Sequence, residues 1–449
     1  MSVWPRTVSV FRKWGFEDSF RGIVTQSPVP DLAWEMRKSD QREGVLFHVW
    51  KLAGGLHSFH RAHLLSLLSS LLPPSCYTFS SPLKSYTQSP SSNSVTLHFE
   101  NAPSQTFDAL IAADGLWSPV RTQMYKELSS TGFTSTSTGP SKAGGEGKVD
   151  CLPKWTGTTV FRALIPLKNL AEFDPSHRAL RAPQMYCGHN KRVLTYPMNR
   201  GETINFVLFL SSPSKEGTSY EQHWEWQKES DVSKAYLGGL LEGWEEEVQV
   251  LVRMIPDRLG PPGPTRWPLY ALNPLPEYTN GRVALLGDAA HATTPHFGFG
   301  ACSSIEDALT LSTLLLDPRT TSQTLPLALD VYGKVRCEEG RRIIEGSREV
   351  GFLYEFSAAG IRRGPDGPDG SSSRSPGSPE SPVSPLSSSS SGGQSGGGEG
   401  RGEREEGEVD LKRVSELIGI KTRWIGEGDV WGDVEGALRV YGERLATIG

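Results

Sequence analysis

The sequence predicts an α/β protein in which a doubly wound domain is interrupted by a second domain built on an antiparallel sheet. Two apolar strands that each end in an aspartate beside a glycine, at 109–115 and 283–288, indicate the first domain. Apolar runs rich in β-branched and aromatic residues between positions 155 and 270 indicate the second sheet. Helical periodicity begins near residue 301 and returns at the C-terminus, which predicts C-terminal helices.

Changes in composition and pattern divide the chain into six segments. The doubly wound domain is expected to be split in two, and the Gly-, Pro- and Ser-rich segment is expected to be a disordered insertion, because it cannot bury enough apolar surface to fold. In order, the segments are 1–128 (doubly wound domain, first part), 129–150 (flexible loop), 151–275 (second domain), 276–363 (doubly wound domain, second part, and a long helix), 364–409 (disordered insertion) and 410–449 (C-terminal helical element).

Individual elements follow from the periodicity of apolar residues. Alternation predicts a half-exposed strand over Val95–Phe99, and continuous apolar runs predict strands over Ala109–Ala113 and Val283–Leu286. Further strands are predicted at Thr158–Leu164, Arg192–Met198 and Phe206–Leu210, and a long helix at 326–358.

Composition excludes some classes of function. The 449 residues carry a net charge of −5 spread over both signs, so no basic surface for nucleic acid is expected. The five cysteines show no metal-ligand spacing and no paired framework, which suits a reducing compartment, so the cytoplasm is expected. No apolar run reaches the ~18–20 residues that a membrane span needs.

The stretch from 282 to 309 carries the strongest chemical signal. Asp288 follows the predicted strand at its carboxyl end, where α/β sheets bind ligands, and a carboxylate there can accept hydrogen bonds from sugar-like hydroxyls. Pro295 fixes the loop, and Gly298 and Gly300 allow close approach of a flat ring or a phosphate. The helix that begins near Ala301 directs its free N–H groups at such a ligand. The alternative is an ordinary strand-to-helix turn.

This stretch resembles the second FAD-binding motif of the class A flavoprotein aromatic monooxygenases, most closely the fungal salicylate hydroxylases. The segments 107–121, which contains Asp114-Gly115, and 59–68, which begins Phe-His-Arg61, resemble two other motifs of that family in the right order. The resemblance implies a Rossmann-like FAD-binding domain. It assigns cofactor contacts to nine residues: Arg61, Asp114, Gly115, Gly287, Asp288, Pro295, Gly298, Gly300 and Ala301.

The family's activity is the hydroxylation of a small, phenolic acid-like aromatic substrate with FAD, NADH or NADPH, and O2, and the resemblance implies the same here. Two alternatives remain open. One is a related flavoenzyme, such as an epoxidase, and the other is a non-catalytic or truncated remnant of the family.

Four side chains are candidates for the substrate cavity: Tyr186, His189, Tyr196 and His296. Tyr196 and His296 are the candidate catalytic residues, although a lone histidine is more often a packing residue than a base. His291 is expected to lie behind the loop.

The chain also departs from the family pattern. No strand followed by Gly-x-Gly-x-x-Gly and a helix opens it, so the first βαβ unit, roughly 30 residues or more, is expected to be missing, as in an incomplete gene model, a shortened splice form or a degenerate copy. Phe297 stands where the family has a glutamine, and Cys302 replaces a glycine. We expect Phe297 to narrow the cavity and the Cβ of Cys302 to hinder the closest approach of backbone.

Overall fold

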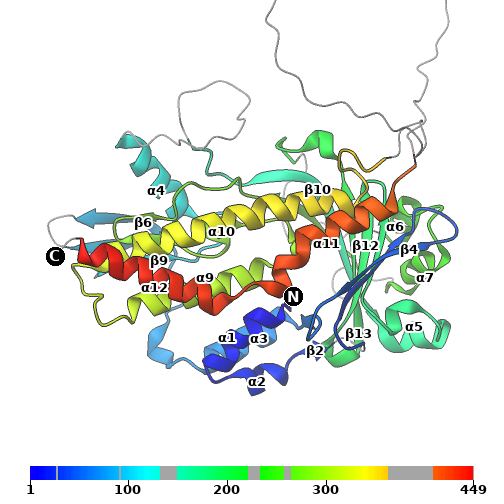
Figure 1. Ribbon diagram of the computed structural model, residues 1–449, viewed down its shortest axis with the longest axis horizontal. Helices are drawn as coiled ribbons and strands as arrows, with labels where there is room; N and C mark the ends of the chain where they lie inside the picture. Colours follow the sequence, from blue (N-terminus) through cyan, green and yellow to red (C-terminus); the bar gives the residue numbers. More distant parts are fainter. Residues whose placement is uncertain are drawn as a thin grey trace, which may run out of the picture.

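The computed structural model describes residues 1–26, 29–89, 93–131, 149–220, 233–256, 264–362 and 408–447. Figure 1 shows a large sheet with short helices on one side of the molecule, smaller sheets on the other, and long helices that run between them. The predicted loop 129–150 and insertion 364–409 lie almost entirely outside the described residues.

The large sheet has seven strands in the order β14-β10-β13-β12-β11-β3-β4. All neighbours are antiparallel except β11 and β3, which are parallel. The strands are β3 (Leu32–Lys38), β4 (Val45–Lys51), β10 (Lys154–Pro166), β11 (Gln184–Gly188), β12 (Lys191–Met198), β13 (Thr203–Ser211) and β14 (Thr265–Ala271). The three predicted strands of the second domain are therefore observed; β12 begins one residue earlier than expected, and β10 and β13 extend several residues beyond the predicted bounds.

The two faces of this sheet serve different purposes because side chains alternate along each strand. On β10 and β13, Phe161, Phe206 and Leu208 lie in an apolar core with α5 (Leu167–Phe173), α6 (Lys234–Leu240) and α7 (Glu246–Met254). Val160, Arg162 and Phe209 point from the same strands to the opposite face, where they line a cavity.

Strands β3 and β4 come from the first part of the chain, yet they extend the second domain's sheet. The sequence analysis assigned these residues to the doubly wound domain because it followed the order of the chain. Sheet membership depends instead on long-range backbone pairing, here between Gln184–Cys187 and Glu35–Lys38. The six boundaries as such stay a prediction.

The doubly wound part contains a buried parallel pair, β9 (Leu110–Ala112) and β16 (Val283–Leu285), with β15 (Thr279–Asn280) at the edge. An antiparallel meander packs nearby, formed by β6 (Leu83–Ser89), β7 (Ser94–Phe99) and β8 (Gln105–Phe107). The helix α4 (Pro119–Ser130) shares an apolar core with both sheets. The strands predicted from alternation and from continuous apolar runs are thus present.

The N-terminal residues form a third small sheet of β1 (Ser2–Val3), β5 (His57–Ser58) and β2 (Thr25–Gln26). Three helices accompany it: α1 (Pro5–Lys13), α2 (Glu17–Arg21) and α3 (Arg61–Ser70). Single 3₁₀ turns occur at Pro74–Cys76 (η1), Arg178–Leu180 (η2), Asn199–Gly201 (η3), Pro213–Lys215 (η4) and Pro295–Phe297 (η5).

Four helices join the parts of the molecule. The short helix α8 (Asp288–His291) is followed by α9 (Gly300–Leu315) and α10 (Leu325–Tyr354). Figure 1 shows α10 as a long yellow helix that runs from the smaller sheets to the large sheet. The predicted C-terminal helical element consists of two helices, α11 (Leu411–Glu427) and α12 (Val430–Ala446), which lie along α10 and α9. The break falls where Asp429 caps the first turn of α12 by accepting a hydrogen bond from Trp431 N–H.

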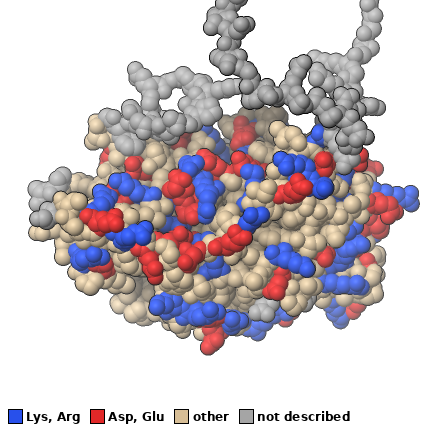
Figure 2. Space-filling model, viewed as in Figure 1, with Lys and Arg blue, Asp and Glu red and all other residues tan. Residues whose placement is uncertain are grey.

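On the face that Figure 2 shows, acidic and basic side chains are interleaved. Among the described residues, none of the helices is both long and apolar enough to cross a membrane.

Candidate active site

The predicted strand-to-helix corner has a backbone that glycine favours. Gly287 follows β16 with φ 63° and ψ −137°, and a Cβ there would lie 2.9 Å from Ser304 Oγ. Asp288 begins α8, is exposed, and lines the cavity, whereas Ala289 and Ala290 beside it are fully buried. The corner therefore exposes the Asp288 carboxylate to the cavity and buries the two alanines that follow it.

The next turn of the chain leaves backbone open to the same cavity. Gly298 is left-handed, with φ 61°, and an ideal Cβ there would meet no atom closer than 3.6 Å; at Gly300 it would meet nothing within 4 Å. Pro295 and Ala301 also line the cavity. Since Phe299 provides no side-chain cap for α9, the N–H groups of the first turn are open to a ligand.

The second Asp-Gly pair lies one strand away. Asp114 is exposed, its Oδ2 accepts a hydrogen bond from Val120 N–H at 3.4 Å, and Gly115 has φ 80°. β9 is the parallel neighbour of β16, so Asp114 and Asp288 follow the carboxyl ends of adjacent strands. Neither Asp114 nor Gly115 is among the residues that line the cavity.

A buried arginine, which the sequence analysis missed, joins these two loops. Arg121 donates to three carbonyl oxygens, those of Ala289 at 2.9 Å, Cys151 at 2.8 Å and Leu116 at 2.6 Å. The contact to Ala289 fixes the Asp288 corner relative to the Asp114 loop.

Arg61 is the first residue of α3, and its side chain is exposed. His60 caps this helix by accepting a hydrogen bond from Ala62 N–H at 3.3 Å. Arg61 does not line the cavity.

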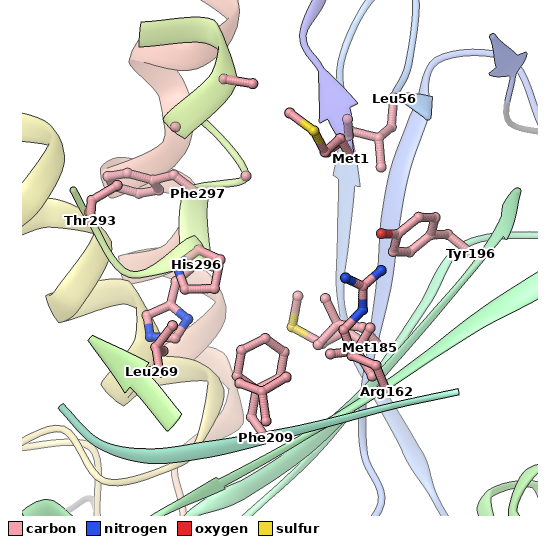
Figure 3. Close-up of a pocket in the computed structure, with 18 of the residues that line it drawn as sticks. Met1, Leu56, Arg162, Met185, Tyr196, Phe209, Leu269, Thr293, His296 and Phe297 are labelled. Carbon is pink, nitrogen blue, oxygen red and sulfur yellow. The ribbon is translucent and has the colours of Figure 1, made fainter. Parts of the chain in front are cut away.

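The cavity has a volume of about 480 Å³, within the range of small-molecule sites. Trp34, Phe209 and Trp267 provide aromatic surface, and the loop from Pro295 to Ala301 also lines the cavity. Figure 3 shows His296 and Phe297 of this loop across the cavity from Arg162 and Tyr196. Among the described lining residues, Arg162 is the only arginine or lysine. Its Nη2 donates to Asn205 Oδ1 at 3.2 Å, and it points into the cavity beside Tyr196 (Figure 3).

Of the four candidates for the cavity, the structure brings Tyr196 and His296 to its wall and leaves the other two elsewhere. Tyr186 is buried on the opposite side of the sheet, where its hydroxyl donates to Glu247 Oε2 at 3.2 Å. His189 interacts with Arg362 near the surface. The apolar pattern did not show which face of β11 Tyr186 occupies, nor that His189 lies in the turn between β11 and β12.

Burial lowers the pKa of His296 well below its ordinary value, and Arg192 acts in the same direction. His296 Nδ1 accepts a hydrogen bond from Arg192, so the imidazole is neutral at pH 7 with its proton on Nε2. Burial raises the pKa of the Tyr196 phenol, while Arg162 pulls it down by less. Tyr196 is therefore a protonated hydrogen-bond donor at pH 7.

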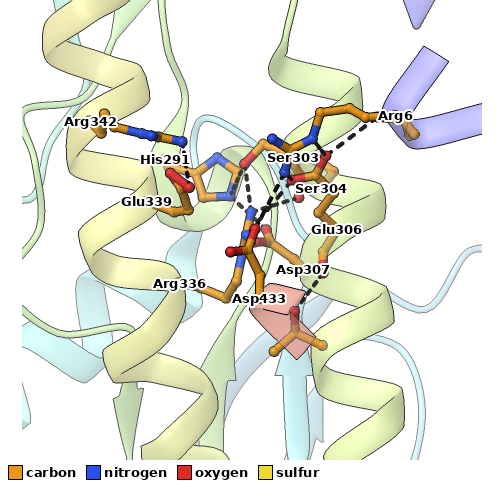
Figure 4. Close-up of polar contacts among 12 residues, drawn as sticks. Arg6, His291, Ser303, Ser304, Glu306, Asp307, Arg336, Glu339, Arg342 and Asp433 are labelled. Atoms are coloured by element: carbon orange, nitrogen blue, oxygen red, sulfur yellow. Dashed lines mark hydrogen bonds and ion pairs between the residues drawn. The ribbon is translucent and has the colours of Figure 1, made fainter. Parts of the chain in front are cut away.

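His291 lies behind the loop, as expected, in a buried ionic network (Figure 4). The carboxylate of Asp307 accepts from Gly287 N–H at 2.9 Å, His291 Nε2 at 2.6 Å and Arg336 Nε at 2.6 Å. The adjacent Glu306 accepts from Arg6 at 2.9 and 3.0 Å. Two neighbouring carboxylates on α9 thus hold the Asp288 corner and the start of α1.

The two departures from the family loop have clear positions. The Phe297 side chain forms part of the cavity wall but is only 2% exposed, because its ring packs into the core. Cys302 is fully buried, and its Sγ accepts a hydrogen bond from Trp4 N–H at 3.4 Å. Burial raises the pKa of this thiol to about 12, so it is unreactive near pH 7.

Comparison with known proteins identifies the class. Residues 266–347 match the FAD binding domain family, and these residues contain the Asp288 corner and the loop. An FAD-dependent monooxygenase of Strobilurus tenacellus is 30% identical over 70% of this chain and 70% of its own length. A salicylate hydroxylase of Pseudomonas putida is 30% identical over 79% of this chain and 76% of its own length.

Solved structures agree. A salicylate hydroxylase in a substrate complex matches with a TM-score of 0.74 and 25% identity, covering 97% of this chain and 90% of that chain. Klebsiella pneumoniae HpxO with FAD and uric acid matches in fold, with a TM-score of 0.60, 23% identity and 79% of both chains covered.

The chain belongs to the FAD-dependent aromatic monooxygenases, the family that includes the salicylate hydroxylases. It is an oxidoreductase whose cofactor is FAD. The predicted fold class, family, aromatic monooxygenase activity and cofactor are confirmed, and the expected loss of the first βαβ unit stays a prediction. The roles of individual residues stay predictions.

Proposed function

We propose that this chain hydroxylates a small aromatic carboxylic acid, using FAD, NADH or NADPH, and O2. The observation that carries the proposal is Arg162, a cation that points into an otherwise largely apolar, aromatic-walled cavity next to the flavin-binding loop. Relatives of similar sequence include the salicylate hydroxylase of P. putida and a 6-methylsalicylate 1-monooxygenase of Aspergillus terreus.

The residues that line the cavity fit the flavin ring and ribityl chain of FAD. Asp288 would accept hydrogen bonds from the ribityl hydroxyls, and the open backbone from Pro295 through Gly298 and Gly300 to Ala301 would face the flavin ring. The positive end of α9 favours negative charge on a reduced flavin ring. Arg61 and the Asp114-Gly115 pair would serve the more distant part of the cofactor. Bound FAD supplies the redox chemistry that places one oxygen atom of O2 on the ring.

The remaining cavity fits a flat anion. Trp34, Phe209 and Trp267 offer ring surfaces for an aromatic substrate. Arg162 binds its carboxylate, and Asn205 restrains the guanidinium, so less side-chain entropy is lost on binding. Tyr196 donates a second hydrogen bond to the same anion or to a phenolic oxygen beside it. His296 forms the wall and holds no free base at Nδ1, because Arg192 occupies that atom.

The compartment that we propose is the cytoplasm, because the described cysteines form no disulfide and the family's reaction draws on a pool of NADH or NADPH.

The test is a turnover assay with salicylate as the probe. The chain, supplied with FAD, should oxidise NADH or NADPH faster when salicylate is added, and mass spectrometry should detect a hydroxylated product. Flavin binding without that product would favour a related flavoenzyme, and protein that retains no flavin would favour a non-catalytic remnant.

A substitution at Arg162 tests the substrate class. Loss of a charge-assisted hydrogen bond of ~1.5–3 kcal/mol predicts that Arg162→Met lowers kcat/KM for salicylate by ~10–100-fold. The neutral analogue salicylamide should be affected much less, because it carries no carboxylate. Arg341→Met, on the exposed side of α10, is the control and should leave both values unchanged. An equal loss for acid and amide would contradict the assignment of Arg162 as a carboxylate anchor.

A further inference from the structure

The loop from Pro295 to Gly300 supplies one wall of the cavity, so whatever holds this loop sets the shape of the site. Two contacts hold its backbone. Trp4 Nε1 donates to the carbonyl oxygen of Phe297 at 3.0 Å, and His296 N–H donates to Ser347 Oγ of α10 at 3.2 Å. Neither contact fixes the two phenylalanine rings of the loop.

Those rings are held by the C-terminal helix α11. Trp424 meets Phe297 edge-on, with centroids 5.5 Å apart and planes at 81°, and meets Phe299 with centroids 4.9 Å apart at 66°. Both arrangements are favourable aromatic geometries. The guanidinium of Arg342 on α10 lies 4.3 Å from the Trp424 ring centre, a cation–π contact that helps to hold the indole.

Helix α10 is shaped to receive the same loop. A Cβ at position 346 would lie 2.9 Å from the Phe297 ring, and one at position 351 would lie 2.2 Å from the His296 ring, so glycines at both positions leave room for the two side chains. Phe297 is consequently enclosed between α10 on one side and Trp424 on the other, and is only 2% exposed.

We propose that Trp424 is a positioning residue of the active site, which acts through Phe297 and Phe299 to set the loop that faces flavin and substrate. The C-terminal helix α11 then supports this wall from outside the cavity, since Trp424 itself does not line it. The expected effect of Trp424 on turnover rests on the proposed function, whereas its expected effect on the loop does not.

The first experiment measures the loop directly, by amide hydrogen exchange in the full chain. Trp424→Ala should speed the exchange of residues 294–300, whose His296 and Gly298 N–H groups are hydrogen-bonded. Trp424→Phe should restore most of the protection, since a smaller ring still meets both phenylalanines. Trp431→Ala is the matched control: this tryptophan belongs to α12, donates to Ser9 Oγ at 3.2 Å, and contacts neither phenylalanine.

The second experiment measures turnover. Trp424→Ala should raise KM for salicylate ~10-fold, the order expected when two aromatic pairs are lost, while Trp431→Ala leaves KM unchanged. Equal loop exchange in wild type and Trp424→Ala, or equal loss of protection in both tryptophan variants, would overturn the proposal. If wild type fails to turn over salicylate, the proposed function fails, and loop exchange still decides the role of Trp424.

Discussion

Asp288 is the exposed carboxylate at a corner whose neighbours are buried, and we propose that it binds the cofactor. We predict that Asp288→Ala raises the dissociation constant of FAD by ~10–100-fold, the loss expected for a charge-assisted hydrogen bond of ~1.5–3 kcal/mol. Fluorescence titration with FAD measures this value.

Asp288→Asn is the matched variant, since it keeps one acceptor oxygen and should lose less affinity than alanine. Glu435→Ala, on the exposed side of α12, should have no effect. Unchanged FAD affinity in Asp288→Ala would contradict the assignment of this motif.

The sequence predicted those site residues that lie close together along the chain. Asp288, Gly298 and Pro295 fall within one strand-to-helix connection, and the structure brings them to one cavity. Arg162 could not be identified in this way, because β10 is covered on both faces and its apolar pattern does not show which residues face the site. Arg121 acts on backbone carbonyls far along the chain, which leave no mark in the sequence.

At the scale of elements, α9 carries two adjacent buried carboxylates with opposite behaviour. Burial raises the pKa of Glu306, against the weaker effects of Arg6 and Arg336. Burial would also raise the pKa of Asp307, but His291 and Arg336 outweigh it and hold that pKa well below its ordinary value. Asp307 therefore stabilises the fold above its unfolded pKa of about 4, and this contribution is lost as the pH falls below that value.

We predict that Asp307→Asn lowers the free energy of unfolding at pH 7 by about 3–5 kcal/mol, because it leaves Arg336 buried beside a neutral group. The difference from wild type should shrink as the pH falls below about 4, towards the lowered pKa of the folded Asp307 carboxyl. Urea unfolding at several pH values checks this.

Stability should depend on pH in the opposite direction at Glu306. Its raised pKa means that protonation favours the folded state, so the wild type gains stability relative to Glu306→Gln as the pH falls. If both variants showed the same pH trend, the proposed difference between the two carboxylates would be wrong.

Elements with a strong local pattern were predictable, and elements defined by distant pairing were not. The strand at Val283–Leu285 is a continuous apolar run and the helix at Leu325–Tyr354 has helical periodicity, and both were predicted within a few residues. The membership of β3 and β4 in the seven-stranded sheet depends on contacts with residues about 150 positions away, such as Glu35 with Gln184.

At the scale of the whole molecule, one apolar core joins the large sheet, the N-terminal helices, the loop from Pro295 to Gly300 and the C-terminal helix α11. It contains Met36 and Met185 from the sheet, Phe297 from the loop, and Ile418 from α11. The large sheet and the C-terminal helix α11 are therefore expected to unfold together, because the unfolding of either one would expose the apolar core that they share.

We predict that Ile418→Ala, at a site that is 0% exposed, costs about 2–5 kcal/mol and shifts the unfolding midpoint equally by far-UV circular dichroism and by tryptophan fluorescence. Ile420→Ala on the same helix, where the side chain is 61% exposed, should change little. Two separated transitions in wild type would show that the core does not couple the parts.

Gly346 and Gly351 limit how this enzyme can be redesigned. Each glycine leaves space that a ring of the opposing loop occupies. An increase in side-chain volume on the helix therefore requires a decrease in side-chain volume on the loop. A smaller residue at position 297 would open a void beside Gly346, and a larger one at 346 would displace the loop. Attempts to widen substrate scope should therefore vary positions 297 and 346 as a pair.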